Sequence, residues 1–326
     1  MSLRPALRRL GFGRLAYLLW HVPAGALRDS IAAGGPLEQW RDRRAHATMT
    51  AAAARLQSQM LPLAATGPEI HFLTGARFWD QTALCLHSLQ HHAGQALPAV
   101  FHDDGSATDT IMDRLGRLFP HARWRRHAEI VATLDEHLPI ARFPVLRERW
   151  AAYPNIRKLT DVHVGSRGWK LVLDSDMLFF RRPDFLLAWL AAPGRPLHMV
   201  DVEESYGYSR ALMQSLAGTP IPPLVNVGIT GLAGESLDWE RLEHWCRELI
   251  AAEGASYYLE QALIAMLVAG QPCAVAPAAD YLVLPDEAEC RNPRAVLHHY
   301  VANSKRWYFR ETWRRAVTLP PGSTPD

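Results

Sequence analysis

Two aspartates interrupt an apolar stretch near the middle of the chain. The run Lys170-Leu171-Val172-Leu173 is typical of a buried strand, and it ends on Asp174-Ser175-Asp176 before apolar residues resume. Asp is disfavoured inside strands and is costly to bury without a partner. Because strand side chains alternate between faces, both carboxylates would share one face at the carboxyl end of the strand, where open α/β sheets bind ligands. The pattern indicates two oxygen ligands for a cation.

Two carboxylates are too few to hold a divalent ion, so we expect a third protein ligand, with substrate oxygens completing the shell. An apolar segment near the C-terminus ends in His298 and His299, and Lys305 follows six residues after the second histidine. Only one of the two histidines can face the site, because strand side chains alternate. Imidazole with carboxylates suits Mn²⁺ better than Mg²⁺, and a nearby lysine would neutralise a phosphate. We predict a site for Mn²⁺, or Mg²⁺, formed by Asp174, Asp176 and one of these two histidines.

The order of these residues resembles that of the GT-A-fold glycosyltransferases, most closely the retaining family 8 that contains glycogenin and the bacterial lipopolysaccharide galactosyltransferases. The resemblance runs from about residue 69 to about residue 309. The D-x-D motif of that family falls on residues 174–176, and its late H-x-x-x-x-x-K-x-W motif falls on His299, Lys305 and Trp307. Two acids with one spacer are common by chance, so the ordered set carries the resemblance.

Other family motifs also have counterparts in this chain. They match Thr74 and Phe78 in the loop after the first strand, Lys158 before the D-x-D strand, Asn226-Val227-Gly228, and the pair Glu260-Gln261. Two of these matches depart from the family pattern. Val227 replaces a small residue, which puts sugar or acceptor contacts in question, and Glu260 replaces the more usual Asp.

The resemblance implies transfer of a sugar from a nucleotide diphosphate donor, such as a UDP-sugar, to an acceptor hydroxyl with retention of configuration. The acceptor would be a glycan, a lipid-linked sugar or a small molecule. The metal, held by Asp174, Asp176 and the motif histidine His299, would bridge the two phosphates, with Lys305 adding positive charge. The donor would be contacted by Thr74, Phe78, Lys158, Asp174, Ser175, Asn226 and Gly228, with Phe78 stacked on the base and Asp174 also touching the ribose. Glu260 and Gln261 would line the far face of the sugar.

The implied fold is an α/β GT-A fold, a Rossmann-like, mainly parallel sheet flanked by helices. Strands at 69–73, 97–101, 197–202 and 224–232 alternate with helical patterns, which also favours a mainly parallel sheet. Ser106 would cap a helix that runs to about residue 119. We predict a helical N-terminal extension over 1–66, a GT-A domain over 67–310 and a C-terminal tail over 311–326, disordered from residue 320.

Composition limits the possible functions. The chain has 326 residues, of which 48% are hydrophobic and 21% are charged, as in an ordinary globular protein. A net charge of +2 is too small to indicate nucleic acid binding. The four cysteines show no C-x-x-C spacing, so neither a zinc site nor a disulfide framework is indicated. We interpret them as reduced thiols of a cytoplasmic protein.

The first residues are basic and aromatic. Four arginines precede the short apolar run Leu15 to Trp20, which is shorter than the roughly 18 residues that span a bilayer. Such a segment would lie on an anionic membrane surface, or it would pack on the domain with solvated arginines. Our hypothesis is a peripheral inner-membrane contact through residues 1–30.

Each residue also has a plain structural interpretation, and other functions compete. Asp174 and Asp176 could pair with neighbouring arginines, and Lys305 could be solvated. A sugar nucleotidyltransferase also holds a metal with acids, but it normally carries a Gly-rich phosphate loop, and the first-strand loop here has one glycine, Gly75. The departures at Val227 and Glu260 favour a third option, a catalytically weak GT-A domain that binds carbohydrate or serves as a scaffold.

Overall fold

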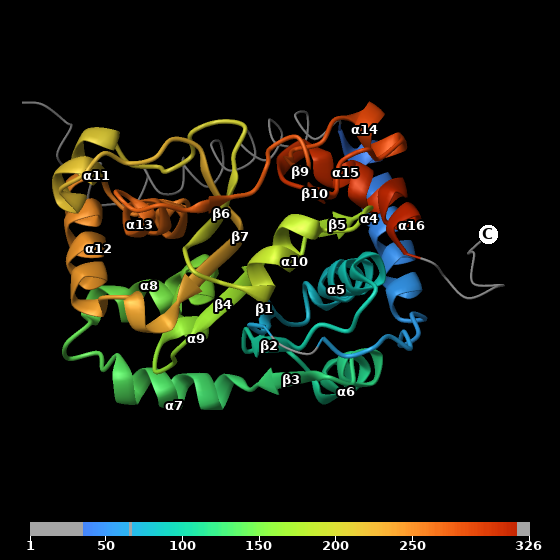
Figure 1. Cartoon of the computed structure of the whole chain (residues 1–326), viewed down its shortest axis with the longest axis horizontal. Coiled ribbons are helices and arrows are strands. Elements are labelled where there is room, and N and C mark those ends of the chain that lie inside the picture. Colours follow the sequence, from blue (N-terminus) through green and yellow to red (C-terminus); the bar gives the residue numbers. More distant parts are fainter. Residues whose placement is uncertain (1–34, 65–66, 318–326) are drawn as a thin grey trace, which may run out of the picture.

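A seven-stranded sheet forms the centre of the computed structural model, which describes residues 35–64 and 67–317 (Figure 1). The strand order is β3-β2-β1-β4-β7-β6-β8. Strand β7 is antiparallel to β4 and β6, and the other neighbouring pairs are parallel. The strands of this sheet are β1 (Ile70–Thr74), β2 (Ala99–Asp103), β3 (Ala122–Arg125), β4 (Trp169–Leu173), β6 (Leu197–Val200), β7 (Val225–Ala233) and β8 (Ala274–Val275).

A second, three-stranded sheet follows the order β5-β10-β9. It contains β5 (Met177–Phe179), β9 (Tyr281–Val283) and β10 (Leu297–His299). Strand β10 pairs antiparallel with β5 and parallel with β9. The chain leaves the large sheet at the end of β4 and enters the small sheet at β5, so residues 174–176 connect the two sheets.

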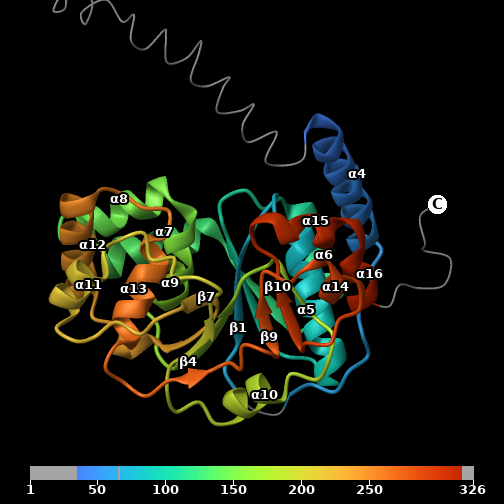
Figure 2. The same cartoon turned by 90° about the horizontal axis from the view of Figure 1, so that it is seen from above.

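Helices cover the sheets and enclose two apolar cores (Figures 1 and 2). One core lies between the sheets and the helices near both ends of the described chain, and it includes Phe72, Phe101 and Trp313. The other lies among the helices around Trp245 and Leu263. The helices are α4 (Pro36–Ala53), α5 (Trp79–Ala93), α6 (Asp109–Leu118), α7 (His127–His137), α8 (Pro144–Ala152), α9 (Arg157–His163), α10 (Asp184–Ala191), α11 (Arg210–Ala217), α12 (Trp239–Glu253), α13 (Leu259–Val268), α14 (Glu287–Arg291), α15 (Lys305–Trp307) and α16 (Trp313–Ala316).

The predicted α/β class with a mainly parallel sheet is confirmed, and several local predictions need correction. Helix α6 is capped by Thr108, whose side chain accepts from the backbone N–H of Ile111, and not by Ser106. Ser106 instead accepts a hydrogen bond from the backbone N–H of Ala76. Residues 226–228 lie inside β7, in agreement with the strand expected at 224–232.

The two ends of the described chain pack together. Residues 311–317, which belong to the predicted C-terminal tail, are largely helical, and Trp313 is fully buried. Helix α4, within the predicted N-terminal extension, contacts the π-helical turn Tyr308–Thr312 and α5. The predicted disorder from residue 320 lies outside the described residues, as do residues 1–30. No helix within residues 35–64 and 67–317 combines the length and apolarity needed to cross a bilayer.

Candidate metal and sugar-donor site

The connection between the two sheets brings Asp174 and Asp176 together. The prediction that both project from one strand face is wrong, because β4 ends at Leu173 and residues 174–176 form a bend. The backbone N–H of Asp174 donates to the carbonyl of Gly228 at 2.8 Å, and the carbonyl of Asp176 accepts from the N–H of Tyr300 at 2.9 Å. These bonds fix the bend to β7 on one side and to the end of β10 on the other.

His299 projects from β10 towards both aspartates. Its Nε2 atom lies 3.6 Å from Oδ2 of Asp174 and 3.4 Å from Oδ1 of Asp176. One ligand atom from each of these three residues lies within 4.8 Å of the others. His298 is buried on the opposite face, with ring nitrogens 3.0 Å from a Glu289 carboxylate oxygen and from the hydroxyl of Tyr300. The predicted alternation of the two histidines is confirmed.

The three side chains fit a divalent cation by their chemistry. Two carboxylate oxygens and one imidazole nitrogen form a mixed donor set of the kind that suits Mn²⁺. Burial disfavours the charged form of Asp176, but its hydrogen bond to His299 and the charge of Lys305 outweigh burial and lower its pKa. The carboxylate is therefore held ionised, which is the form that binds metal.

Lys305 provides the second positive charge at this point. Its Nζ atom lies 2.9 Å from Oδ2 of Asp176, and its side chain is 41% exposed. The lysine follows a 3₁₀ turn, Ala302–Ser304, that returns the chain from β10 towards the site. Burial lowers the pKa of Lys305, whereas the charge and hydrogen bond of Asp176 raise it more, so the ammonium group stays charged.

Lys158 connects the aspartates to Glu260. Its Nζ atom lies 2.7 Å from Oδ1 of Asp174 and 3.2 Å from Oε2 of Glu260. Burial raises the pKa of Glu260 to about 7, with Lys158 opposing the shift and Asp174 adding to it. Glu260 is almost fully buried, so it depends on this one ammonium group for charge compensation. A contact of Lys158 with the donor stays a prediction.

Asp201 joins Asn226 and Gln261 and was not predicted as a site residue. Its Oδ2 atom accepts from the side-chain amides of Asn226 and Gln261, each at 3.0 Å. Asn226 in turn accepts from the backbone N–H of Gly228 at 2.9 Å. The signal for Asp201 is in the sequence, because it directly follows β6 at the carboxyl end of that strand, as Asp174 follows β4.

Comparison with solved structures identifies the fold. No family model and no curated protein matches the sequence. The chain is similar to the bifunctional glycosyltransferase WbbM, with a TM-score of 0.53 and 11% identity over 80% of this chain; it spans about half (51%) of WbbM. It is also similar to the galactosyltransferase LgtC in complex with donor and acceptor sugar analogues, with a TM-score of 0.52 and 14% identity over 78% of this chain and 98% of LgtC. The chain has the GT-A glycosyltransferase fold.

The remaining predicted donor contacts lie on the first βα unit of this GT-A fold. Oγ1 of Thr82 lies 2.7 Å from the hydroxyl of Thr74 and 2.7 Å from that of Ser175. Thr74 is fully buried, and the hydroxyl of Thr82 on α5 links β1 to the bend. Phe78 directly precedes α5 and is partly exposed, with the Arg77 guanidinium 5.1 Å from its ring centre. Stacking of a base on Phe78 stays a prediction.

Three tyrosines lie next to the buried end of the GT-A site. The rings of Tyr153 and Tyr257 have centres 5.6 Å apart, and those of Tyr257 and Tyr258 have centres 5.3 Å apart. Tyr257 is 67% exposed and Tyr258 is 41% exposed. The hydroxyl of Tyr153 donates to the backbone carbonyl of Tyr257. Tyr257 and Tyr258 directly precede α13, which carries Glu260 and Gln261. An exposed aromatic surface therefore borders the site.

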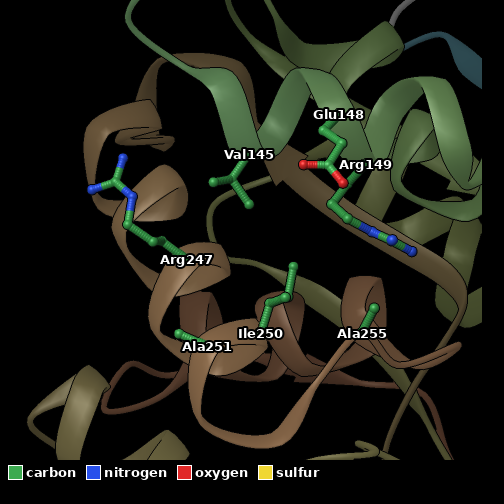
Figure 3. Close-up of a pocket in the computed structure, with 7 residues that line it drawn as sticks. All are labelled: Val145, Glu148, Arg149, Arg247, Ile250, Ala251 and Ala255. Carbon is green, nitrogen blue, oxygen red and sulfur yellow. The ribbon is translucent and has the colours of Figure 1, made fainter.

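A cavity of about 240 Å³ between α8 and α12 is separate from this chemistry (Figure 3). Apolar side chains such as Val145 and Ile250 line it together with charged residues, and no predicted site residue does. Arg247 is already paired with Glu243 at 2.9 Å, and the Arg149 guanidinium lies over the ring of Tyr153. We assign no role in sugar transfer to this cavity.

Gly228→Ala tests the position of His299. A Cβ atom on Gly228 would lie 2.5 Å from two ring atoms of His299, so the ring must move. We expect Mn²⁺ affinity, measured by isothermal titration calorimetry, to fall about 10- to 100-fold, as when the orientation of a metal ligand is lost. Gly116→Ala is the matched control, because Gly116 is exposed on α6 with open space around it. Unchanged affinity in Gly228→Ala would contradict a ligand role for His299.

Proposed function

We propose that this protein transfers a sugar from a nucleotide diphosphate donor to an acceptor hydroxyl, with a divalent cation bound by Asp174, Asp176 and His299. One observation carries the proposal: these three side chains converge in a GT-A fold, beside the partly exposed Lys305, which is paired with Asp176. The leaving group of such a reaction is a nucleoside diphosphate, whose negative charge increases as the glycosidic bond breaks. A site that concentrates positive charge stabilises that state.

The cation, which we propose to be Mn²⁺, would act as a Lewis acid on the diphosphate. The protein's own residues do the rest. Asp176 stays ionised, and the backbone bonds of the bend hold Asp174 and Asp176 in place. When phosphate oxygens arrive, Lys305 can exchange its ion pair with Asp176 for a pair with the donor, because its side chain is partly exposed.

Glu260 and Gln261 are our candidates for the reacting side of the sugar. Gln261 is oriented by Asp201, and Glu260 is held by Lys158. Their burial keeps water away from the amide and carboxylate groups. We propose retention of anomeric configuration, and both the covalent and the same-face route stay open in this proposal.

A UDP-sugar is the proposed donor, with Phe78 below the base, Thr74, Ser175, Asn226 and Gly228 around the donor, and Asp174 near the ribose. The proposed acceptor is a glycan or lipid-linked sugar, because the exposed rings of Tyr257 and Tyr258 border the site and sugar rings pack well on aromatic faces.

All four cysteines lie in the described residues as free thiols, which supports our proposal of a cytoplasmic location.

A donor-hydrolysis panel tests the proposed reaction. The full-length protein is incubated with UDP-glucose, UDP-galactose and their N-acetyl forms, and released UDP is measured with Mn²⁺, with Mg²⁺ and with a chelator. We expect at least one donor to be turned over with Mn²⁺ and none with the chelator. Binding of Mn²⁺ and UDP without any turnover would favour a non-catalytic binding or scaffold domain, and no binding of either would reject the proposed site.

A further inference from the structure

Helix α4 turns its acidic residues inward, against the rest of the protein. Glu38 and Asp42 each accept from the guanidinium of Arg310 at 2.6 Å. One turn further, His46 stacks on Phe309 with ring centres 4.4 Å apart. Residues 38, 42 and 46 follow i, i+4 spacing and therefore share one face of the helix. In the first three turns of α4 this inner face is polar and pairs with the body of the protein, and the buried apolar residues Met49, Ala52 and Ala53 all lie in the last two turns.

The opposite face of α4 is apolar, aromatic and basic. Leu37 is 60% exposed and Trp40 is 50% exposed. Arg43 and Arg44 are also exposed, and the Arg44 guanidinium lies 5.5 Å from the centre of the Trp40 ring. Residues 37, 40 and 44 follow i, i+3, i+7 spacing and form one stripe, with Arg41 and Arg43 beside it. A helix that only packed on the domain would turn Leu and Trp inward and its acids outward, so this reversed pattern indicates an external partner.

Charge indicates what that partner is. Residues 1–66 contain nine arginines, no lysine and three acidic residues, a charge of +6 within a chain whose total is +2. Two of the three acids are Glu38 and Asp42, which both pair with Arg310, and Glu38 also pairs with Arg41, so among the described residues Arg43 and Arg44 carry the uncompensated positive charge of this helix. The outer face therefore presents positive charge together with exposed Leu and Trp. Arginine with an interfacial aromatic is the combination that binds anionic bilayers, where Trp lies at the level of the headgroups.

We propose that the outer face of α4, formed by Leu37, Trp40, Arg41, Arg43 and Arg44, docks the protein on an anionic lipid surface. Figure 2 shows α4 at the edge of the molecule, and its inner face contacts the turn Tyr308–Thr312, which directly follows the helix that carries Lys305. If the proposed sugar transfer is correct, docking through the outer face keeps the protein at the surface where lipid-linked acceptors lie. The docking itself does not depend on the proposed reaction.

Vesicle sedimentation with the full-length protein tests the docking. The vesicles contain phosphatidylcholine alone or with roughly 30% phosphatidylglycerol, and the variant is Arg43→Glu/Arg44→Glu. Each basic residue near an anionic surface adds roughly a fivefold increase in partitioning, so we expect this double reversal to weaken binding to the anionic vesicles at least about tenfold. Trp40→Ala should weaken binding to the same vesicles a few fold.

Arg117→Glu/Arg195→Glu is the matched control, because it makes the same charge change on two exposed arginines outside α4. We expect it to keep most of the binding. Equal binding of the α4 variant and the wild type would overturn the proposal and assign any lipid binding to other residues, such as 1–34. An equal loss in the control would also overturn it, because net charge alone would then explain the binding. UDP release by the α4 variant should match the wild type, which separates this test from that of the proposed reaction.

Discussion

Asp176→Asn is expected to lower Mn²⁺-dependent turnover of the sugar donor by roughly 10²- to 10³-fold, the size of effect seen when one stabilising group of a charged transition state is removed. The amide keeps the shape of the side chain but removes the charge that His299 and Lys305 now face at 3.4 and 2.9 Å. The backbone carbonyl of residue 176 still accepts from Tyr300, so we expect the bend to keep its shape.

The measurement is UDP release as a function of Mn²⁺ concentration, with thermal unfolding as a check of the fold. Asp184→Asn is the matched control, since Asp184 is an 80% exposed aspartate paired with Arg182 at the start of α10. If both Asp176→Asn and Asp184→Asn keep full metal-dependent turnover, Asp176 is not a metal ligand and the proposed site is wrong.

The parts of the site that could be predicted are those governed by strand geometry. Alternation of side chains separated His298 from His299, and the preference of Asp for strand ends placed the two aspartates at the edge of the sheet. The sheet order could not be read in the same way. Strand β7 lies antiparallel between β4 and β6. The local pattern of apolar residues in a buried strand does not indicate whether it runs parallel or antiparallel to its neighbours.

The contacts that the sequence could not supply are those between distant segments. Lys158 lies between Asp174 and Glu260 because α9, the bend and α13 meet there. A resemblance to a family assigns a role to each residue separately, and it gives no information on which residues neutralise one another. The same holds for the contacts of Asp201. Its position at the end of β6 can be recognised in the sequence, but the hydrogen bonds that it accepts from Asn226 and Gln261 cannot.

A second large effect is expected on the free energy of unfolding as the pH falls, because three buried histidines lie close together on β1, β2 and α9. Nδ1 of His71 on β1 lies 2.9 Å from Nε2 of His102 on β2. Their outer nitrogens, and Nδ1 of His163 on α9, are buried without a hydrogen-bond partner among the described residues. A proton added at any of these nitrogens would find no acceptor, and Lys170 and the arginines of β3 lie close enough to repel it.

Burial, followed by the neighbouring positive charges, lowers the pKa of His71 and of His102 well below the usual value. In the unfolded chain both histidines take up protons below about pH 6.5, whereas in the folded protein they stay neutral. Protonation of the two histidines in the unfolded chain therefore lowers the free energy of unfolding as the pH falls below about 6.5, and above that pH they cause no loss. At about pH 5.5 the two together should reduce the free energy of unfolding by about 3 kcal/mol relative to about pH 8.

Urea unfolding of the wild type and of His71→Gln/His102→Gln at several pH values measures this contribution. The comparison with the variant is needed because the raised pKa of Glu260 and of Asp161 acts in the opposite direction over the same pH range. We expect the variant to lose stability on acidification by about 3 kcal/mol less than the wild type. His244→Gln, on the exposed surface of α12, should follow the wild type. Parallel pH profiles for the wild type and the double variant would contradict the prediction, because they would mean that the pair takes up protons in the folded protein as readily as in the unfolded chain.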